Sequence, residues 1–307
     1  MSGRQEDYAI LGLGVAAVST AAVLIREAAA PALVIAAYRL TLAAVPLAGV
    51  AVVRREPLLP SGRRQAGLTL LSGVFLAFHF GFWIASVKET SIITSVVLVT
   101  AQPLFVAAAA GPLLGERPAA GVWLGILLAA AGSALMVADD VGRGGGTLRG
   151  DLFAVLGAMF AAAYILSGRN LRTSGSGWLS YVTAVYGTSA VLLVAGAAAS
   201  GARLGGYSGA TYGYLVLLAL VPQLLGHTAL NRSLGYLPAA TVAVAILGEP
   251  VGATILGAGV LGETPTLLQG LGALLVLAGV YAGVRGSRSA TERVKEQRPR
   301  EDLTQEA

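Results

Sequence analysis

The chain has 307 residues, of which 55% are hydrophobic and only 12% are charged. A soluble domain carries about 25% charged residues, so this chain has too few polar side chains to cover a soluble surface of its size. It contains no cysteine, which excludes disulfides, thiolate catalysis, iron–sulfur ligation and cysteine-based zinc sites. The composition therefore predicts an integral membrane protein.

Ten apolar blocks, separated by charged residues or by glycine and proline, predict ten membrane-spanning helices. The blocks lie at residues 8–25, 31–53, 66–87, 91–111, 118–138, 151–168, 178–200, 211–230, 236–259 and 264–284. The first block is interpreted as a helix and not as a secretory signal, because "MSGRQED" before it is not basic and no soluble domain follows. Residues 285–307 are of mixed charge without apolar periodicity, and they predict a disordered cytoplasmic tail.

Lysine and arginine predict the orientation of these spans. If both termini lie in the cytoplasm, 15 of the 21 basic residues fall on the cytoplasmic side, five fall on the other side, and Arg39 lies within a span. Cytoplasmic loops carry an excess of Lys and Arg, so we expect both termini in the cytoplasm. The net charge of +5 then needs no nucleic-acid partner to explain it.

The chain also contains an internal duplication. Pro103 and Pro250 are 147 residues apart, and so are Glu116 and Glu263. A constant offset between Glu and Pro positions is not explained by shared apolar composition. The repeats are expected at residues 1–138 and 151–284, with a periplasmic or extracellular linker at 139–150. Each repeat holds five spans, an odd number, so the second repeat enters the membrane from the opposite side. Such inverted-topology repeats are typical of secondary transporters that work by alternating access.

Several segments resemble a known family. "GEPVGATILGAGVLGETPTLLQGLGALLVLAGV" and its counterpart "AQPLFVAAAAGPLLGERPAAGVWLGILLAAAGSALMV" are similar to the paired EamA domains of the drug/metabolite transporter superfamily. The same family is resembled by three further segments, "WIASVKETSI", "NRSLGYLPAA" and "AAYRLTLAAVP". The resemblance covers the chain to about Val284. It implies a ten-helix carrier of the inner (plasma) membrane, commonly an exporter of amino acids or other small metabolites. It does not imply a particular substrate.

Two charged residues inside the spans are candidates for function. Glu249 lies near the middle of the ninth span, where a carboxylate must be protonated, paired or facing a water-filled cavity. Its counterpart is Gln102, so one titratable group lies at a pseudo-symmetric pair of positions, which suits proton or cation coupling. The alternative is a neutral Glu249 that holds two helices together. Arg39 in the second span could pair with Glu249, bind a substrate carboxylate, or extend to the membrane surface.

Two prolines are expected to kink their helices. Pro103 and Pro250 lack an N–H and clash with the carbonyls of Val99 and Ile246, four residues earlier. A carbonyl freed in this way can bind substrate or water and can mark a hinge, although a static kink is equally compatible with the sequence.

The remaining candidates are polar and aromatic residues expected to line a central cavity. Two stripes with helical spacing, Phe75, His79 and Trp83 and then Gln223, His227 and Asn231, lie in equivalent spans of the two repeats. Either histidine could instead bond the backbone of a neighbouring helix. Tyrosines could line the cavity or lie in an interfacial aromatic belt. The expected lining is His79, Trp83, Gln102, His227, Asn231, Tyr38, Tyr164 and Tyr186.

Other features indicate structure. Glu116 and Glu263 are expected to cap the helices that follow them, and glycines four apart, as in Gly121 and Gly125, indicate close helix packing. No metal site is expected, because neither histidine has a suitably spaced partner. The glycine-rich "GGGTLRG" lacks the Lys and Ser/Thr ending of a phosphate-binding loop, so no nucleotide cofactor is expected.

The sequence as a whole predicts a secondary active transporter and not an enzyme, with a small-molecule substrate, the lipid bilayer as its surroundings and an unspecified oligomeric state. Export of small metabolites, with or without proton coupling, is the main hypothesis. An uncoupled facilitator, an uptake carrier, and a membrane enzyme acting on a small or lipid-linked substrate are the alternatives.

Overall fold

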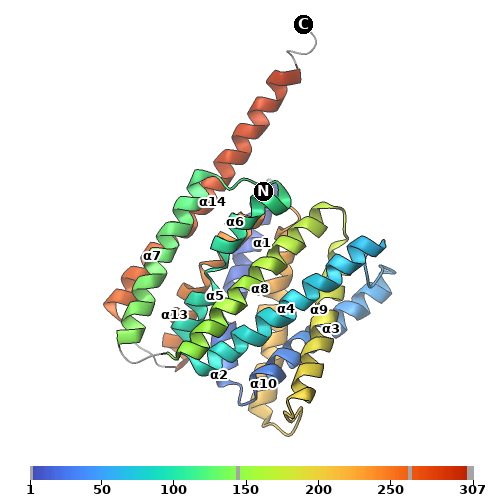
Figure 1. Cartoon of the computed structure of the whole chain (residues 1–307), viewed down its shortest axis with the longest axis vertical. Coiled ribbons are helices and arrows are strands. Elements are labelled where there is room, and N and C mark those ends of the chain that lie inside the picture. Colours follow the sequence, from blue (N-terminus) through green and yellow to red (C-terminus); the bar gives the residue numbers. More distant parts are fainter. Residues whose placement is uncertain (1–2, 143–145, 262–264, 303–307) are drawn as a thin grey trace.

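The computed structural model describes residues 3–142, 146–261 and 265–302, and within these ranges the regular structure is entirely helical (Figure 1). The first repeat contains α1 (Gly3–Val18), α2 (Ala21–Glu27), α3 (Ala32–Val53), α4 (Arg63–Glu89), α5 (Ile92–Val99), α6 (Gln102–Leu114) and α7 (Ala120–Gly142). The second contains α8 (Leu148–Thr173), α9 (Trp178–Ala199), α10 (Gly209–Leu218), the π-helix η1 (Ala219–His227), α11 (Thr228–Ser233), α12 (Ala239–Ile246), α13 (Glu249–Leu261) and α14 (Leu267–Asp302).

These helices form ten segments, among the described residues, that are long and apolar enough to cross a membrane. The segments have 20 to 27 residues each, and a bilayer core needs about 20. Four of them combine two or three of the helices named above, such as α1 with α2 and α5 with α6. The ten-helix, all-α fold predicted from the sequence is confirmed.

The two repeats pack against each other through equivalent helices. In the first repeat α4 contacts α8 of the second, and the equivalent contact joins α1 to η1 and α11. The second spans, α3 and α9, pack together, and so do the last spans, α7 and α14. The larger helix contacts therefore join the two repeats.

The contact between α7 and α14, which we call the glycine seam, brings two backbones together (Figure 1). A Cβ atom at Gly125 would lie 2.6 Å from the carbonyl oxygen of Gly279, and one at Gly132 would lie 2.5 Å from that of Gly272. Since no side chain fits between the helices at these positions, the close packing expected from the glycine spacing is confirmed.

Two of the interrupted spans, the fourth and the ninth, break at equivalent positions near the middle of the bundle. The fourth span breaks between α5 and α6, and the ninth breaks between α12 and α13. The last residues of α5 and α12 are Val99 and Ile246, and each precedes a proline, Pro103 or Pro250, by four residues. The missing proline N–H and the clash with the earlier carbonyl account for the position of both breaks.

The structure differs from the expected domain boundaries at two places. Helix α14 continues to Asp302, whereas a disordered tail was expected from residue 285; the segment has no proline before Pro299 to stop the helix. The expected linker at 139–150 is shorter, because α7 extends to Gly142 and α8 begins at Leu148. Glu263, predicted to cap a helix, lies outside the described residues.

Candidate functional site

The two helix breaks place equivalent residues of the repeats at the centre of the bundle. Gln102 is the first residue of α6 and Glu249 is the first residue of α13. The first turn of a helix has backbone N–H groups without helical partners and the positive end of the helix dipole. Both side chains are buried and face a shared cavity. The two half-helices therefore direct donors and partial positive charge toward this space.

The cavity is built by both repeats and is small in this conformation. Its walls come from α1, α4, α5, α6, α8, η1, α11, α12 and α13. Its volume is about 40 Å³, enough for a few water molecules, whereas pockets for small molecules have about 300–1,000 Å³. Helices must separate before a metabolite can enter. The expected residues that line it are His79, Trp83, Gln102, Tyr164, His227, Asn231 and Glu249.

Two of the expected tyrosines lie outside the cavity lining. Tyr186 is fully buried beside it, with its hydroxyl 3.2 Å from Thr228 Oγ1 and within bonding distance of Asn231 Nδ2. Tyr38 does not line the cavity, and its hydroxyl donates to the carbonyl of Leu204 at 2.8 Å in the loop before α10. Its ring also meets Tyr212 edge-on, so Tyr38 belongs to the periphery of the bundle.

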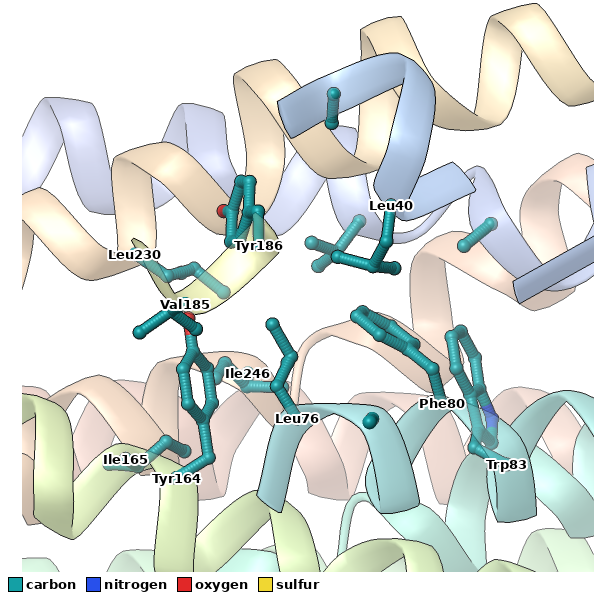
Figure 2. Packing of buried hydrophobic residues seen from close by; sticks show 14 of the residues in the cluster. Leu40, Leu76, Phe80, Trp83, Tyr164, Ile165, Val185, Tyr186, Leu230 and Ile246 are labelled. Carbon is teal, nitrogen blue, oxygen red and sulfur yellow. The ribbon is translucent and has the colours of Figure 1, made fainter. Parts of the chain in front are cut away.

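Figure 2 shows the aromatic rings of this region. Phe80 and Trp83 of α4 lie side by side, and Tyr164 and Tyr186 occupy the other side of the view. His79 stacks on Trp83 with ring centroids 5.9 Å apart, and its Nδ1 donates to the carbonyl of Gly157 at 2.9 Å. His79 therefore bonds a neighbouring helix backbone and lines the cavity as well.

His227 lies across from His79, with their ring centroids 6.3 Å apart. Among the residues that the structure describes, no group of three or more His, Cys, Asp or Glu side chains could hold a metal ion.

Arg39 is completely buried on α3, so it does not extend to the membrane surface. Its Nε donates to Gln223 Oε1 at 2.8 Å, and its guanidinium carbon lies 4.1 Å from the centroid of the Phe80 ring. The other two guanidinium nitrogens are buried without a hydrogen-bond partner among the described residues. Glu249 interacts with Arg39 electrostatically but makes no ion pair with it. The charge pair expected from the sequence is thus separated in this conformation.

Gln223 reaches Arg39 because of the π-helix. The expected stripe of Gln223, His227 and Asn231 assumed α-helical spacing, yet only the last two line the cavity. In η1 the N–H of Thr228 donates to the carbonyl of Gln223 five residues earlier, and the hydroxyl of Thr228 bonds the same carbonyl at 3.1 Å. This wider turn gives Gln223 a different direction from the rest of the stripe. π-helical turns occur frequently at functional sites.

Comparison with known proteins identifies the family. The family model described as "EamA-like transporter family" matches residues 8–138 and 148–284, which is nearly the whole chain. The chain belongs to this family. It is therefore a membrane transporter of the drug/metabolite transporter superfamily with a small-molecule substrate, as the sequence resemblance implied.

The other comparisons give information only about the fold of this EamA-like transporter. No curated protein matches the chain. A solved structure described as "Crystal structure of protein" is similar, with 17% identity, a TM-score of 0.77, and coverage of 93% of this chain and 99% of that chain. At this identity the likeness shows the fold and not the substrate.

Polar clusters close the EamA-like bundle at both ends. Near the end where α1 begins, Arg169 Nε lies 2.5 Å from Glu116 Oε1 and Arg169 Nη1 donates to the carbonyl of Leu234 at 2.9 Å. Glu116 Oε2 also accepts the N–H of Ala239 at 3.0 Å. Glu116 therefore caps α12 of the other repeat, not the following helix α7 as expected. We call Glu116, Arg169 and Ala239 the inter-repeat latch.

The opposite end has a comparable cluster around Arg26, which is 143 residues before Arg169 in the repeat. Arg26 Nη2 donates to the carbonyl of Thr90 at 2.6 Å, and the hydroxyl of Thr90 donates to Asp151 at 2.8 Å. Lys88 Nζ donates to the carbonyl of Ala28 at 2.7 Å. In both clusters an arginine that ends the first or sixth span binds the backbone after the third or eighth. The cavity thus lies between two closures related by the repeat.

Proposed function

We propose that this EamA-like transporter is a secondary active carrier that exports small metabolites such as amino acids by alternating access. The observation that carries the proposal is the cavity between the repeats, which Glu249 and Gln102 line as the first residues of two half-helices. Inverted repeats can exchange conformations, and the exchange turns a cavity that opens to one side into one that opens to the other. The closures at the two ends would then open in turn.

Proton coupling rests on Glu249. Among the described residues that line the cavity it is the one carboxylate, and its repeat counterpart Gln102 is neutral. A carboxylate at this depth marks ion or proton pathways in many transporters. In the proposed cycle Glu249 gains a proton from one side of the membrane and loses it to the other, while the substrate moves in the opposite direction.

The proposed location is the inner (plasma) membrane with both termini in the cytoplasm. The distribution of arginine and lysine supports this orientation, since 15 of the 21 fall on the side of the termini. In that orientation the inter-repeat latch is the cytoplasmic closure, and the cluster around Arg26 faces the outside.

A flux measurement tests the proposal. Purified protein is reconstituted into liposomes that contain a pH-sensitive dye, and amino acids, amines and other small metabolites are added one at a time, with protein-free liposomes as the control. A substrate-dependent proton movement is the expected result.

Flux of a labelled compound without proton movement would support an uncoupled facilitator or an uptake carrier instead. Conversion of a substrate in detergent, where no gradient exists, would favour the membrane enzyme and would contradict the carrier.

A further inference from the structure

Hydrogen-bond donors without acceptors gather beside the cavity. Nη1 and Nη2 of Arg39, Nε2 of Gln223 and Nε1 of Trp83 are all buried and make no hydrogen bond of good geometry among the described residues, although the Gln223 amide lies near the Tyr186 hydroxyl. Buried polar groups in native proteins are nearly always hydrogen-bonded, so each exception needs an explanation. All four of these atoms are donors, and two of them belong to a cation. A partner for these four atoms must be an acceptor and should carry negative charge, while Asn231 Oδ1, a buried acceptor in the cavity lining, lacks a donor.

The donors belong to one arrangement. Arg39 Nε binds Gln223 Oε1 at 2.8 Å, which fixes the guanidinium and the amide relative to each other. The guanidinium carbon lies 4.1 Å from the Phe80 ring centroid and 5.8 Å from that of Trp83. These aromatic contacts stabilise a desolvated cation in part but leave its outward donors unused. Phe80, which the sequence did not single out, and Gln223, which was expected to line the cavity, thus hold Arg39 in place.

We propose that Arg39 and Gln223 form a binding site for the carboxylate group of the transported substrate, an inference that rests on the proposed carrier function. The planar guanidinium presents two parallel donors, which match the two oxygens of a carboxylate. Gln223 Nε2 supplies a further donor from η1. A single fixed cation suits a singly charged carboxylate better than a doubly charged anion.

The aromatic side chains connect this site with the cavity. Trp83 lines the cavity and also faces Arg39, whereas Arg39 and Gln223 do not line the cavity in this closed conformation. The ring of Phe80 covers the guanidinium. A substrate therefore reaches the donors only when α4 and η1 move relative to each other. Phe80 and Trp83 would then contact the apolar part of the same substrate.

Binding to the purified protein in detergent tests the site without any gradient. The probes are phenylacetate, its neutral amide phenylacetamide, the cation phenethylamine, and sulfate. The readouts are the thermal unfolding midpoint and the intrinsic tryptophan fluorescence, to which Trp83 contributes as one of three tryptophans in the chain. Phenylacetate should raise the midpoint and change the fluorescence in a saturable manner. The other three probes should do neither at the same concentration.

Two variants and one matched control locate the effect. Arg39→Lys keeps the charge but loses the paired donors, and Gln223→Met keeps the side-chain length but loses the amide. Each should weaken phenylacetate binding by about tenfold or more, the loss expected for one hydrogen bond to a charged group. Gln269→Met removes a buried glutamine on α14, outside the cavity lining, and should leave the affinity unchanged. If Arg39→Lys does not yield monodisperse protein, the phenylacetate affinity of Gln223→Met alone tests the site.

Several outcomes would overturn the assignment. They are equal binding of phenylacetate and its amide, equal binding of sulfate, no binding of phenylacetate, and wild-type affinity in either variant that yields monodisperse protein. Different results would refute the carrier proposal and the carboxylate site. Transport of an uncharged or cationic compound without carboxylate binding would refute this site alone, and carboxylate binding without flux of any probe would refute the carrier alone.

Discussion

The glycine seam predicts that one methyl group at Gly125 destabilises the protein. A Cβ atom there would lie 2.6 Å from the carbonyl oxygen of Gly279 and 2.7 Å from both Cα and N of Gly283, while ordinary contacts begin at 3.4 Å. All three obstacles are backbone atoms, which cannot rotate away. In Gly125→Ala the two helices must separate by about 0.8 Å at this point to restore normal contacts.

The size of the effect follows from two opposing terms. Overpacking of this kind costs about 1–3 kcal/mol. Replacing glycine by alanine inside a helix returns about 0.5–1 kcal/mol, because alanine loses less backbone entropy on folding. The matched control is Gly187→Ala on α9, where a Cβ atom meets nothing within 4 Å. That variant should show only the gain, so the difference between the two variants should be about 1–3 kcal/mol.

Unfolding in mixed micelles of increasing denaturing detergent measures the free energy of unfolding for both variants and the wild type. The expected order of stability is Gly187→Ala, then wild type, then Gly125→Ala. A difference between the two variants of less than about 0.5 kcal/mol, the usual scatter of such comparisons, would refute the backbone-contact argument.

Three further variants test the site and its closures. Glu249→Gln should insert and fold normally but transport at a rate independent of pH, and an unchanged pH profile in liposomes would remove Glu249 from coupling. Glu116→Gln should weaken its bond to the mostly buried Arg169 by about 1.5–3 kcal/mol and expose the cavity at that end. The chain has no native cysteine, so the exposure can be measured by thiol labelling of a single cysteine introduced into the cavity lining. Faster labelling in Glu116→Gln is expected, and an unchanged labelling rate would contradict the role of the latch. Pro222→Ala restores an N–H inside η1 and should return this helix toward α-helical spacing. Gln223 would then rotate by about 100°, and the affinity for phenylacetate should fall. Wild-type affinity would argue against the π-helix as the reason that Gln223 faces Arg39.

The sequence was sufficient for the fold because the membrane imposes strong constraints. Each span needs about 20 apolar residues, and loops carry the charges that separate them. The duplication was visible because Glu116, Pro103 and their counterparts keep one offset. The exact helix limits were harder to predict, since α14 extends well past the last apolar residue.

The site was predictable where a polar residue interrupts an apolar span. Glu249, Gln102 and Asn231 were found in this way, and all three line the cavity. Phe80 gives no such signal, because a phenylalanine in an apolar span looks like any lipid-facing or core residue. Tyr38 was placed at the cavity on residue type alone, and its hydroxyl bonds a loop instead.

Gln223 shows a different limit of sequence reasoning. Its spacing from His227 and Asn231 suggested one shared direction, but that argument holds only for an α-helix. A π-turn cannot be recognised from residue spacing, although Pro222 is a hint that the regular hydrogen-bond pattern fails there. The depth of Arg39 was likewise undecided, because its long side chain could reach either the surface or the core.

The glycine seam also sets an order on biosynthesis. The partner of α7 is α14, which leaves the ribosome after the rest of the second repeat, so the glycine face of α7 has no matching surface while spans six to nine are being made. A nascent chain that stops before residue 267 cannot form the seam at all. Close packing of α7 therefore waits for the insertion of α14.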